Sequence, residues 1–126
     1  MHRSRIGVVL IDHPAEQYDA AMTFWAGAIG HPAKPDEDGT YASLDTLGAS
    51  TSLELQRLGA GTSARVHLNI ETDDVPAEIA RVVALGAAIV QQRDGYAIRT
   101  DPGGLLFCVV PVQHPAAFDA HAVNWP

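Results

Sequence analysis

Two stretches of the sequence decide the fold: RVHLNIETDD at residues 65–74 and DPGGLLFCVV at residues 101–110. In the first, apolar residues at 66, 68 and 70 alternate with polar residues at 67, 69 and 71, which is typical of a strand with one buried face. Asp73 and Asp74 then predict a helix start, because their carboxylates can cap free N–H groups. The second stretch predicts a turn and an apolar strand with Cys108 in its middle. Together they indicate half of a β-rich domain whose strands can line a cavity.

The residues between these stretches complete one structural module. A helix follows Asp74, with Pro76 in its first turn and Gly86 as its stop. Three strands are expected at residues 87–92, 96–100 and 105–110, and the turns between them contain Asp94-Gly95 and Asp101-Pro102-Gly103-Gly104.

The first half of the chain has the same order of elements. It predicts a strand at 6–11 that His13-Pro14 ends, a helix at 15–29 that stops at Gly30, a loop or edge hairpin at 32–39, and strands at 40–44 and 51–57. We therefore expect an α+β fold with two β-α-β-β-β modules, which pair into a curved mixed sheet around a cavity.

A single domain spans residues 1–126, with module one at about 4–58, module two at about 64–111 and a C-terminal tail at 112–126. The tail contains Phe118, Val123 and Trp125, which predict that it packs against the domain. We expect a homodimer, and the sequence leaves open whether the modules pair within a chain or between two chains.

The composition excludes several partners. The chain of 126 residues has a net charge of −7 and one lysine, Lys34, so it lacks the clustered basic residues that nucleic-acid binding needs. No apolar run is long enough for a membrane span, and the apolar residues 6–11 are too few for a signal peptide. A single cysteine, Cys108, excludes an internal disulfide and fits a reducing cytoplasm.

Three segments carry a family resemblance: FWAGAIG at 24–30, RVHLNIETDDVPAEIARVVALGA at 65–87 and DPGGLLFCVVP at 101–111. On these segments the chain resembles the glyoxalase-like branch of the vicinal oxygen chelate superfamily. That superfamily includes glyoxalase I, extradiol dioxygenases, methylmalonyl-CoA epimerase, and bleomycin- and fosfomycin-resistance proteins. The segments are specific for the fold and much less specific for the activity, since one scaffold supports several unrelated activities.

The resemblance implies four metal-ligand positions, two in each module. His67 and Glu54 match two of them, whereas no ligand residue stands at Arg5 to Gly7 and Cys108 replaces the last glutamate. His67 and Glu54 can therefore be an incomplete metal site, a general base with its partner, or a polar cavity wall. The site could bind a divalent zinc, nickel, iron or magnesium ion. We expect no cofactor instead, because two protein ligands rarely hold a metal.

Five further residues are candidate ligand contacts: Cys108, Trp25, Gln56, Asn69 and Arg99. Gln56 and Asn69 share strand faces with Glu54 and His67. Arg99 can clamp a carboxylate or phosphate, or it can face solvent. Cys108 can line the cavity or behave as a small buried apolar residue, and Trp25 can be helix core.

Two functions remain open. The first is an enzyme, a lyase or isomerase of glyoxalase type that acts on a small oxygen-rich organic molecule through Glu54 and His67. The alternative is a non-enzymatic protein that sequesters a small molecule, as bleomycin-resistance proteins do. The incomplete set of metal ligands favours the second function or a metal-free enzyme.

Overall fold

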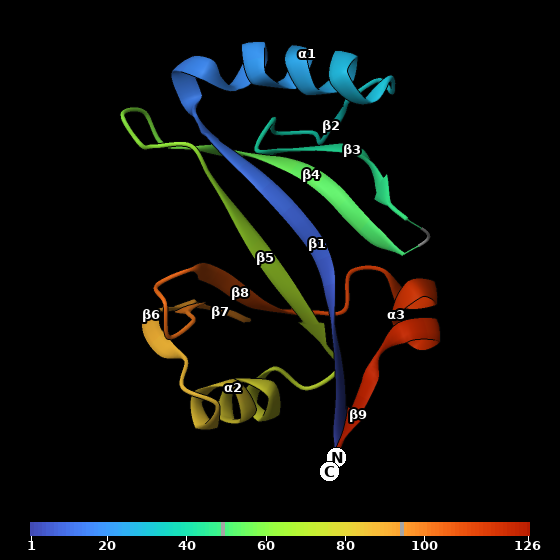
Figure 1. The fold of residues 1–126 in the computed structure, drawn as a ribbon, viewed down its shortest axis with the longest axis vertical. Coiled ribbons are helices and arrows are strands. Elements are labelled where there is room, and N and C mark those ends of the chain that lie inside the picture. Colours follow the sequence, from blue (N-terminus) through green and yellow to red (C-terminus); the bar gives the residue numbers. More distant parts are fainter. Residues whose placement is uncertain (49, 94) are drawn as a thin grey trace. The chain divides into compact units, whose positions relative to one another are not determined.

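The computed structural model describes residues 1–48, 50–93 and 95–126. Its elements in chain order are β1 (His2–Pro14), η1 (Ala15–Gln17), α1 (Tyr18–Ile29), β2 (Lys34–Pro35), β3 (Tyr41–Leu47), β4 (Thr51–Leu58), β5 (Arg65–Thr72), α2 (Val75–Ala84), β6 (Ala88–Arg93), β7 (Tyr96–Thr100), β8 (Leu106–Pro111), α3 (Pro115–His121) and β9 (Val123–Trp125) (Figure 1). The order confirms the α+β class and the repeated β-α-β-β-β pattern. The turn expected at Asp94-Gly95 involves Asp94, which lies outside the described residues.

The chain divides into two compact units. One consists of residues 8–66, and the other consists of residues 67–126 together with residues 1–7. We call them the 8–66 unit and the 67–126 unit. The division falls inside β1 and β5, so both strands contribute residues to both units.

In the 8–66 unit, the strands follow the hydrogen-bonded order β2-β3-β4-β1. β1 runs parallel to β4, and the other neighbours are antiparallel. Helix α1 lies across these strands (Figure 1) and ends at Gly30, whose φ of 77° suits a glycine. The core under α1 comprises Tyr18, Ala42, Leu44, Leu53 and Leu55.

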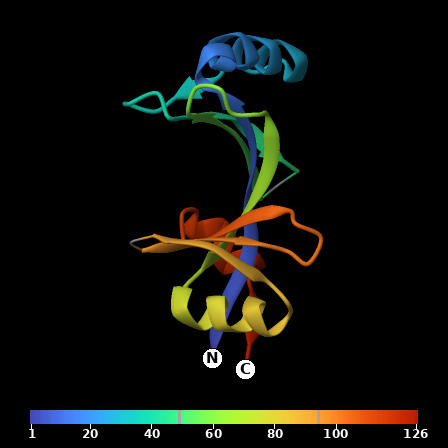
Figure 2. The same ribbon diagram turned by 90° about the vertical axis from the view of Figure 1, so that its left-hand side faces the viewer.

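In the 67–126 unit, the order is β5-β8-β7-β6, with β5 parallel to β8 and the other pairs antiparallel. Helix α2 begins as expected, since Asp74 accepts a hydrogen bond from the Ala77 N–H at 3.0 Å. It lies beside the strands of its own unit (Figure 2) and covers a core of Val82, Phe107 and Val109.

Strand β1 is longer than the sequence predicted. It begins at His2 and continues through His13 and Pro14, which pair in register with Arg57 and Leu58. The predicted break at His13-Pro14 is wrong, because a proline at the end of a strand loses no hydrogen bond that the ladder needs. The polar residues before Ile6 were missed because their charges are buried through partners distant in the sequence.

The C-terminal tail packs, as predicted. Residues 2–4 of β1 pair antiparallel with β9, and both chain ends lie close together (Figures 1 and 2). Phe118 on α3 is 1% exposed, and the Trp125 indole N–H donates to Ser4 Oγ at 2.8 Å.

Candidate functional site

One sheet face of the 67–126 unit gathers three predicted site residues. Leu68 and Ile70 of β5 pack in the core beneath α2, so the alternate residues His67 and Asn69 belong to the opposite face. Asn69 is the register partner of Cys108 on β8, which places Cys108 on that face as well. We call the face of His67, Asn69 and Cys108 the β5–β8 polar face.

The His67 side chain and the Asn69 side-chain oxygen on this face are shielded from solvent. His67 is 4% exposed, and Asn69 Oδ1 is buried. Among the residues that the structure describes, no group donates a hydrogen bond to Asn69 Oδ1. A buried acceptor without a donor is costly, by about 1–3 kcal/mol, so this oxygen is suited to receive an O–H or N–H group from outside the protein.

A buried ion pair between Arg5 and Glu71 lies at the end of the same face. Glu71 is 0% exposed, and its Oε1 accepts a hydrogen bond from Arg5 Nε at 3.0 Å. Its other oxygen accepts the backbone N–H groups of Gln113 and His114 at 2.5 and 2.9 Å. Gly7 provides the room, because a Cβ atom there would overlap the Glu71 carboxylate. Within the range Arg5 to Gly7, where the resemblance expects the first metal ligand, Arg5 thus contributes a guanidinium, which has no lone pair to offer a metal.

The 8–66 unit has a comparable polar face on β4. Leu53 and Leu55 pack under α1, and the alternate residues Ser52, Glu54 and Gln56 point to the other side and are partly buried. We call these three residues the β4 polar face. Glu54 lies in register between Leu10 on β1 and Ser43 on β3.

Glu54 belongs to the 8–66 unit, and His67 belongs to the 67–126 unit. Asn69 and Cys108 are register partners, and Gln56 is two residues from Glu54 on the same strand face. The structure therefore brings the predicted polar residues together as two sets, one on β4 and one on β5 and β8.

Trp25 and Arg99 do not join these sets. Trp25 packs against the core beneath α1 and makes an edge-to-face contact with Phe24, with ring centroids 5.2 Å apart. This placement matches the alternative reading of Trp25 as helix core. Arg99 is the register partner of Phe107, which puts it on the α2 side of its sheet, 3% exposed, with Nη2 donating to Gln92 Oε1 at 3.2 Å.

Sequence reasoning missed a second buried charge in the 67–126 unit. Glu78 on α2 is 0% exposed and accepts hydrogen bonds from Ser4, Arg81 and His2, the last at 2.7 Å. Burial by itself would raise the pKa of Glu78, but the hydrogen bonds from Arg81, His2 and Ser4 outweigh it and hold the pKa below its ordinary value. Arg81 also stacks over Trp125 at 3.9 Å from the ring centroid. The sequence offered one indication that Glu78 is buried, which is its position between apolar residues of a helix.

The comparison with known families decides the identity of the fold. The profile described as "Glyoxalase-like domain" matches residues 8–110, which is most of the chain. The chain belongs to the glyoxalase-like domain family. It is thereby a member of the vicinal oxygen chelate superfamily, as the three sequence segments indicated.

Solved structures agree with this glyoxalase-like fold. A Legionella pneumophila protein described as NAD-dependent benzaldehyde dehydrogenase is similar with a TM-score of 0.63, at 13% identity, over 84% of this chain and 98% of that one. A single-residue variant of the Streptomyces coelicolor methylmalonyl-CoA epimerase, in complex with 2-nitronate-propionyl-CoA, is similar with a TM-score of 0.53, at 19% identity, over 85% of this chain and 93% of the epimerase.

A third structure is a dioxygenase. The 2,2',3-trihydroxybiphenyl 1,2-dioxygenase from Sphingomonas wittichii strain RW1 has a TM-score of 0.54 at 15% identity, and the match covers 91% of this glyoxalase-like chain and 44% of the dioxygenase. At these identities the likeness concerns the fold alone. Among curated proteins, no sequence matches this chain significantly.

Two features are absent from the described parts of the glyoxalase-like domain. Over residues 1–48, 50–93 and 95–126, no group of three or more His, Cys, Asp or Glu side chains is arranged to hold a metal ion. Over the same ranges, no helix combines the length and the apolar character of a transmembrane span.

Proposed function

We propose that this glyoxalase-like domain binds a small oxygen-rich organic molecule on the β5–β8 polar face of its 67–126 unit and transforms it. The observation that carries the proposal is the buried Asn69 Oδ1, for which the described residues supply no donor. A hydroxyl group of a ligand would satisfy it. His67 and Cys108 on the same face support the same reading, since they supply an imidazole and a small polarizable side chain beside the amide.

The proposed reaction is a proton transfer of the lyase or isomerase type. Glu54 acts as the general base, taking a proton from a carbon atom next to a carbonyl group and returning it. A partly buried carboxylate in register with Leu10 and Ser43 is suited to this role, since carboxylates serve as general bases in proton transfer. His67 holds or relays a proton on the β5–β8 polar face.

We further propose that this chemistry proceeds without a resident metal. No ligand residue stands at Arg5 to Gly7, the range that the family resemblance assigns to the first ligand, and the Arg5 guanidinium has no lone pair to offer a metal. The Arg5 guanidinium is fixed by Glu71 at 3.0 Å, and the two backbone N–H groups bound to Glu71 use its other oxygen.

Ligand-induced stabilisation tests the binding step. We would measure the melting temperature of the protein with a panel of small hydroxy acids, diols and dicarbonyl compounds. A ligand at 100 times its Kd stabilises the folded state by about 2.7 kcal/mol, which is a shift of several degrees. Asn69→Ala should weaken the active compound about fivefold, because one hydrogen bond is lost.

Variants separate binding from chemistry. Glu54→Gln should retain binding and lower turnover by about 100-fold or more, because the base is lost. The matched controls Glu37→Gln and His121→Gln change exposed residues and should behave as wild type. If no panel compound stabilises the protein, or if Glu54→Gln turns substrate over normally, the proposal fails.

Elemental analysis tests the metal-free reading. Purified protein should contain less than stoichiometric zinc, nickel, iron or magnesium, and chelator treatment should leave turnover unchanged. Stoichiometric metal that disappears in His67→Ala would overturn this part of the proposal.

A second candidate function is sequestration without chemistry. The Arg5–Glu71 pair favours it, because a buried ion pair at a ligand position is a structural solution rather than a catalytic one. In that case the stabilising compound would be recovered unchanged, and Glu54→Gln would alter affinity alone.

A further inference from the structure

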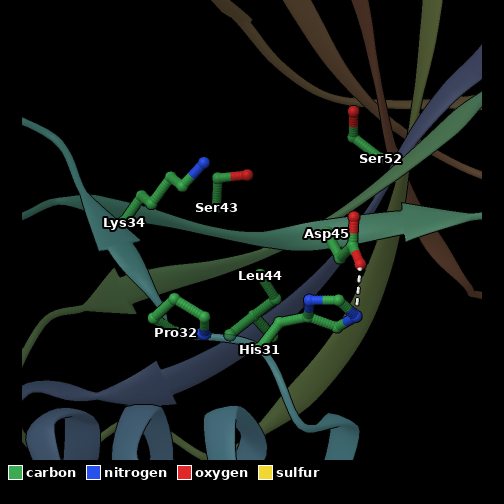
Figure 3. A pocket seen from close by; sticks show the side chains of 7 residues that line it. All are labelled: His31, Pro32, Lys34, Ser43, Leu44, Asp45 and Ser52. Atoms are coloured by element: carbon green, nitrogen blue, oxygen red, sulfur yellow. Dashed lines mark ion pairs between the residues drawn. The ribbon is translucent and has the colours of Figure 1, made fainter.

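The 8–66 unit contains a pocket at the edge of its sheet. The cavity has a volume of about 220 Å³ and is lined by His31, Pro32, Lys34, Ser43, Leu44, Asp45 and Ser52 (Figure 3). These residues come from the α1–β2 connection and from β2, β3 and β4, all within one unit. The site proposed above does not use the His31, Lys34 or Asp45 side chains.

The strand pairing explains why the sheet edge is open here. β2 pairs only two residues of β3, Ala42 and Ser43. The register of β3 against β4 then shifts between Ser43 and Asp45, which is a β-bulge. A bulge bends its strand and re-aims side chains, so neighbouring residues point in directions that regular alternation would not give them. In Figure 3, Leu44 and His31 lie on the α1 side of β3, and Ser43 points to the other side.

The pocket contains an ammonium group, that of Lys34. Within the described parts of the chain, no carboxylate lies at ion-pair distance from Lys34, the one lysine of a sequence with net charge −7. The pocket's own carboxylate, Asp45, is engaged by His31, with Nε2 and Oδ2 3.0 Å apart. The His31 and Asp45 side chains are 57% and 43% exposed, so their contact is a surface ion pair.

The volume limits what can bind. Sites for drug-sized ligands measure about 300–1,000 Å³, whereas one water molecule takes about 30 Å³. A cavity of about 220 Å³ therefore fits a few non-hydrogen atoms with their water, or the charged end of a larger molecule. The Lys34 ammonium and the Ser43 hydroxyl are donors suited to oxygen atoms that carry negative charge.

We propose that this pocket binds a small oxyanion, a carboxylate or a phosphoryl group, through Lys34 and Ser43, which are register partners and share one face of the sheet (Figure 3). Ser43 is the register partner of Glu54, so the pocket adjoins the β4 polar face. The inference thus extends the proposed function by naming a charged group of the ligand. It does not depend on any role of Glu54, because anion binding is measured directly.

Titration of ¹⁵N-labelled protein with sodium acetate and with inorganic phosphate tests the proposal, with sodium chloride at equal ionic strength as reference. We expect saturable amide shifts centred on residues 31–34 and 43–45. Saturation by acetate alone assigns a carboxylate, and saturation by phosphate alone assigns a phosphoryl group. Lys34→Met should weaken binding at least tenfold, and Lys34→Arg should restore most of it, since both cations donate to oxyanions.

Arg57→Met is the matched control, because it removes one positive charge from an exposed residue of the same unit. It should leave the titration unchanged. The proposal is overturned if neither anion gives saturable amide shifts at anion concentrations up to about 100 mM. A site that needs more anion than that binds too weakly to be specific. It is also overturned if Lys34→Met binds as wild type, or if Arg57→Met loses as much affinity. Turnover and binding in the Glu54→Gln variant report on the proposed function separately.

Discussion

At the scale of single residues, Gly7 decides where a buried charge lies. The Glu71 carboxylate occupies the space that a Cβ on Gly7 would fill, and from there it reaches Arg5 and two backbone N–H groups. Each oxygen of the carboxylate has partners, which is the condition under which a buried ion pair is tolerated. A glycine that looks like a flexible position in the sequence is therefore a packing requirement.

Gly7→Ala should destabilise the protein by about 1–3 kcal/mol, because the new methyl group displaces the Glu71 carboxylate. Gly27→Ala is the matched control, since Gly27 lies within α1 and a methyl group there would meet nothing within 4 Å. That variant should stabilise the protein by about 0.5–1 kcal/mol through helix propensity. Urea denaturation measures both, and a Gly7→Ala variant as stable as wild type would contradict the packing argument.

Glu78 predicts a pH dependence. Its folded pKa lies below the ordinary value of 4.5, so its contribution to stability is present above about pH 4.5 and is lost as the pH falls through the folded pKa. At pH 7, Glu78→Gln should cost about 1–3 kcal/mol, because the charge-assisted hydrogen bonds weaken. The difference between wild type and Glu78→Gln should shrink as the pH falls below about 4.

The control for this measurement is Asp119→Asn. The Asp119 side chain is 72% exposed and pairs with Arg3 at the surface, so its loss should cost less than about 1 kcal/mol at any pH. A difference for Glu78→Gln that stays constant between pH 7 and pH 3 would refute the assigned cause.

At the scale of elements, the C-terminal tail completes the 67–126 unit. β9 pairs with the start of β1, and α3 places Phe118 in the interior, where the Arg3 guanidinium lies 4.9 Å from its ring centroid. Arg3 also binds Asp73, which lies just before α2. The first strand thus connects the tail to the start of helix α2.

Phe118→Ala should lower the free energy of unfolding by about 3–5 kcal/mol, since it removes a ring that is 1% exposed. Phe24→Ala makes the same chemical change at a ring that is 65% exposed on α1, and it should cost less than about 1 kcal/mol. Chemical denaturation of the two variants compares them. Equal losses would show that the tail does not belong to the folded core.

At the scale of the whole molecule, the two units repeat one design. In each, a helix covers the apolar face of a sheet, and the other face carries half-buried or buried polar residues such as Glu54 or His67. This division leaves a polar face in each unit that the hydrophobic core does not use. The repeated order of elements therefore produces two polar faces from one pattern.

We predict that the protein is a homodimer. Ile89 and Val90, on the last strand of the ladder, are 70% and 53% exposed, and a second copy can cover such apolar surface. Light scattering after size exclusion should give about twice the chain mass of 13.4 kDa at micromolar concentration. A single-chain mass at every concentration tested would refute the prediction.

Periodicity made most of the fold predictable. The bounds of β7 agree with the sequence expectation residue for residue, β5 covers the predicted alternation at 66–71, and the stops at Gly30 and Gly86 lie where expected. The alternation of polar and apolar residues along 66–71 also predicted that Asn69 lies on the sheet face opposite the core. Periodicity did not predict where Trp25 and Arg99 lie. The core covers one face of each sheet or helix, and residues distant in the sequence decide which face that is.

The sequence by itself determined the order of elements, the helix caps and the alternation of polar and apolar residues, because these depend on neighbours within a few positions. Only the tertiary structure decided which charges are buried. His2 meets Glu78 across 76 positions, and Arg5 meets Glu71 across 66. A buried charge is stable only beside its partner, and chain folding alone brings such distant partners together. The pocket around Lys34 likewise arises from a strand bulge and a short edge strand that no motif predicts.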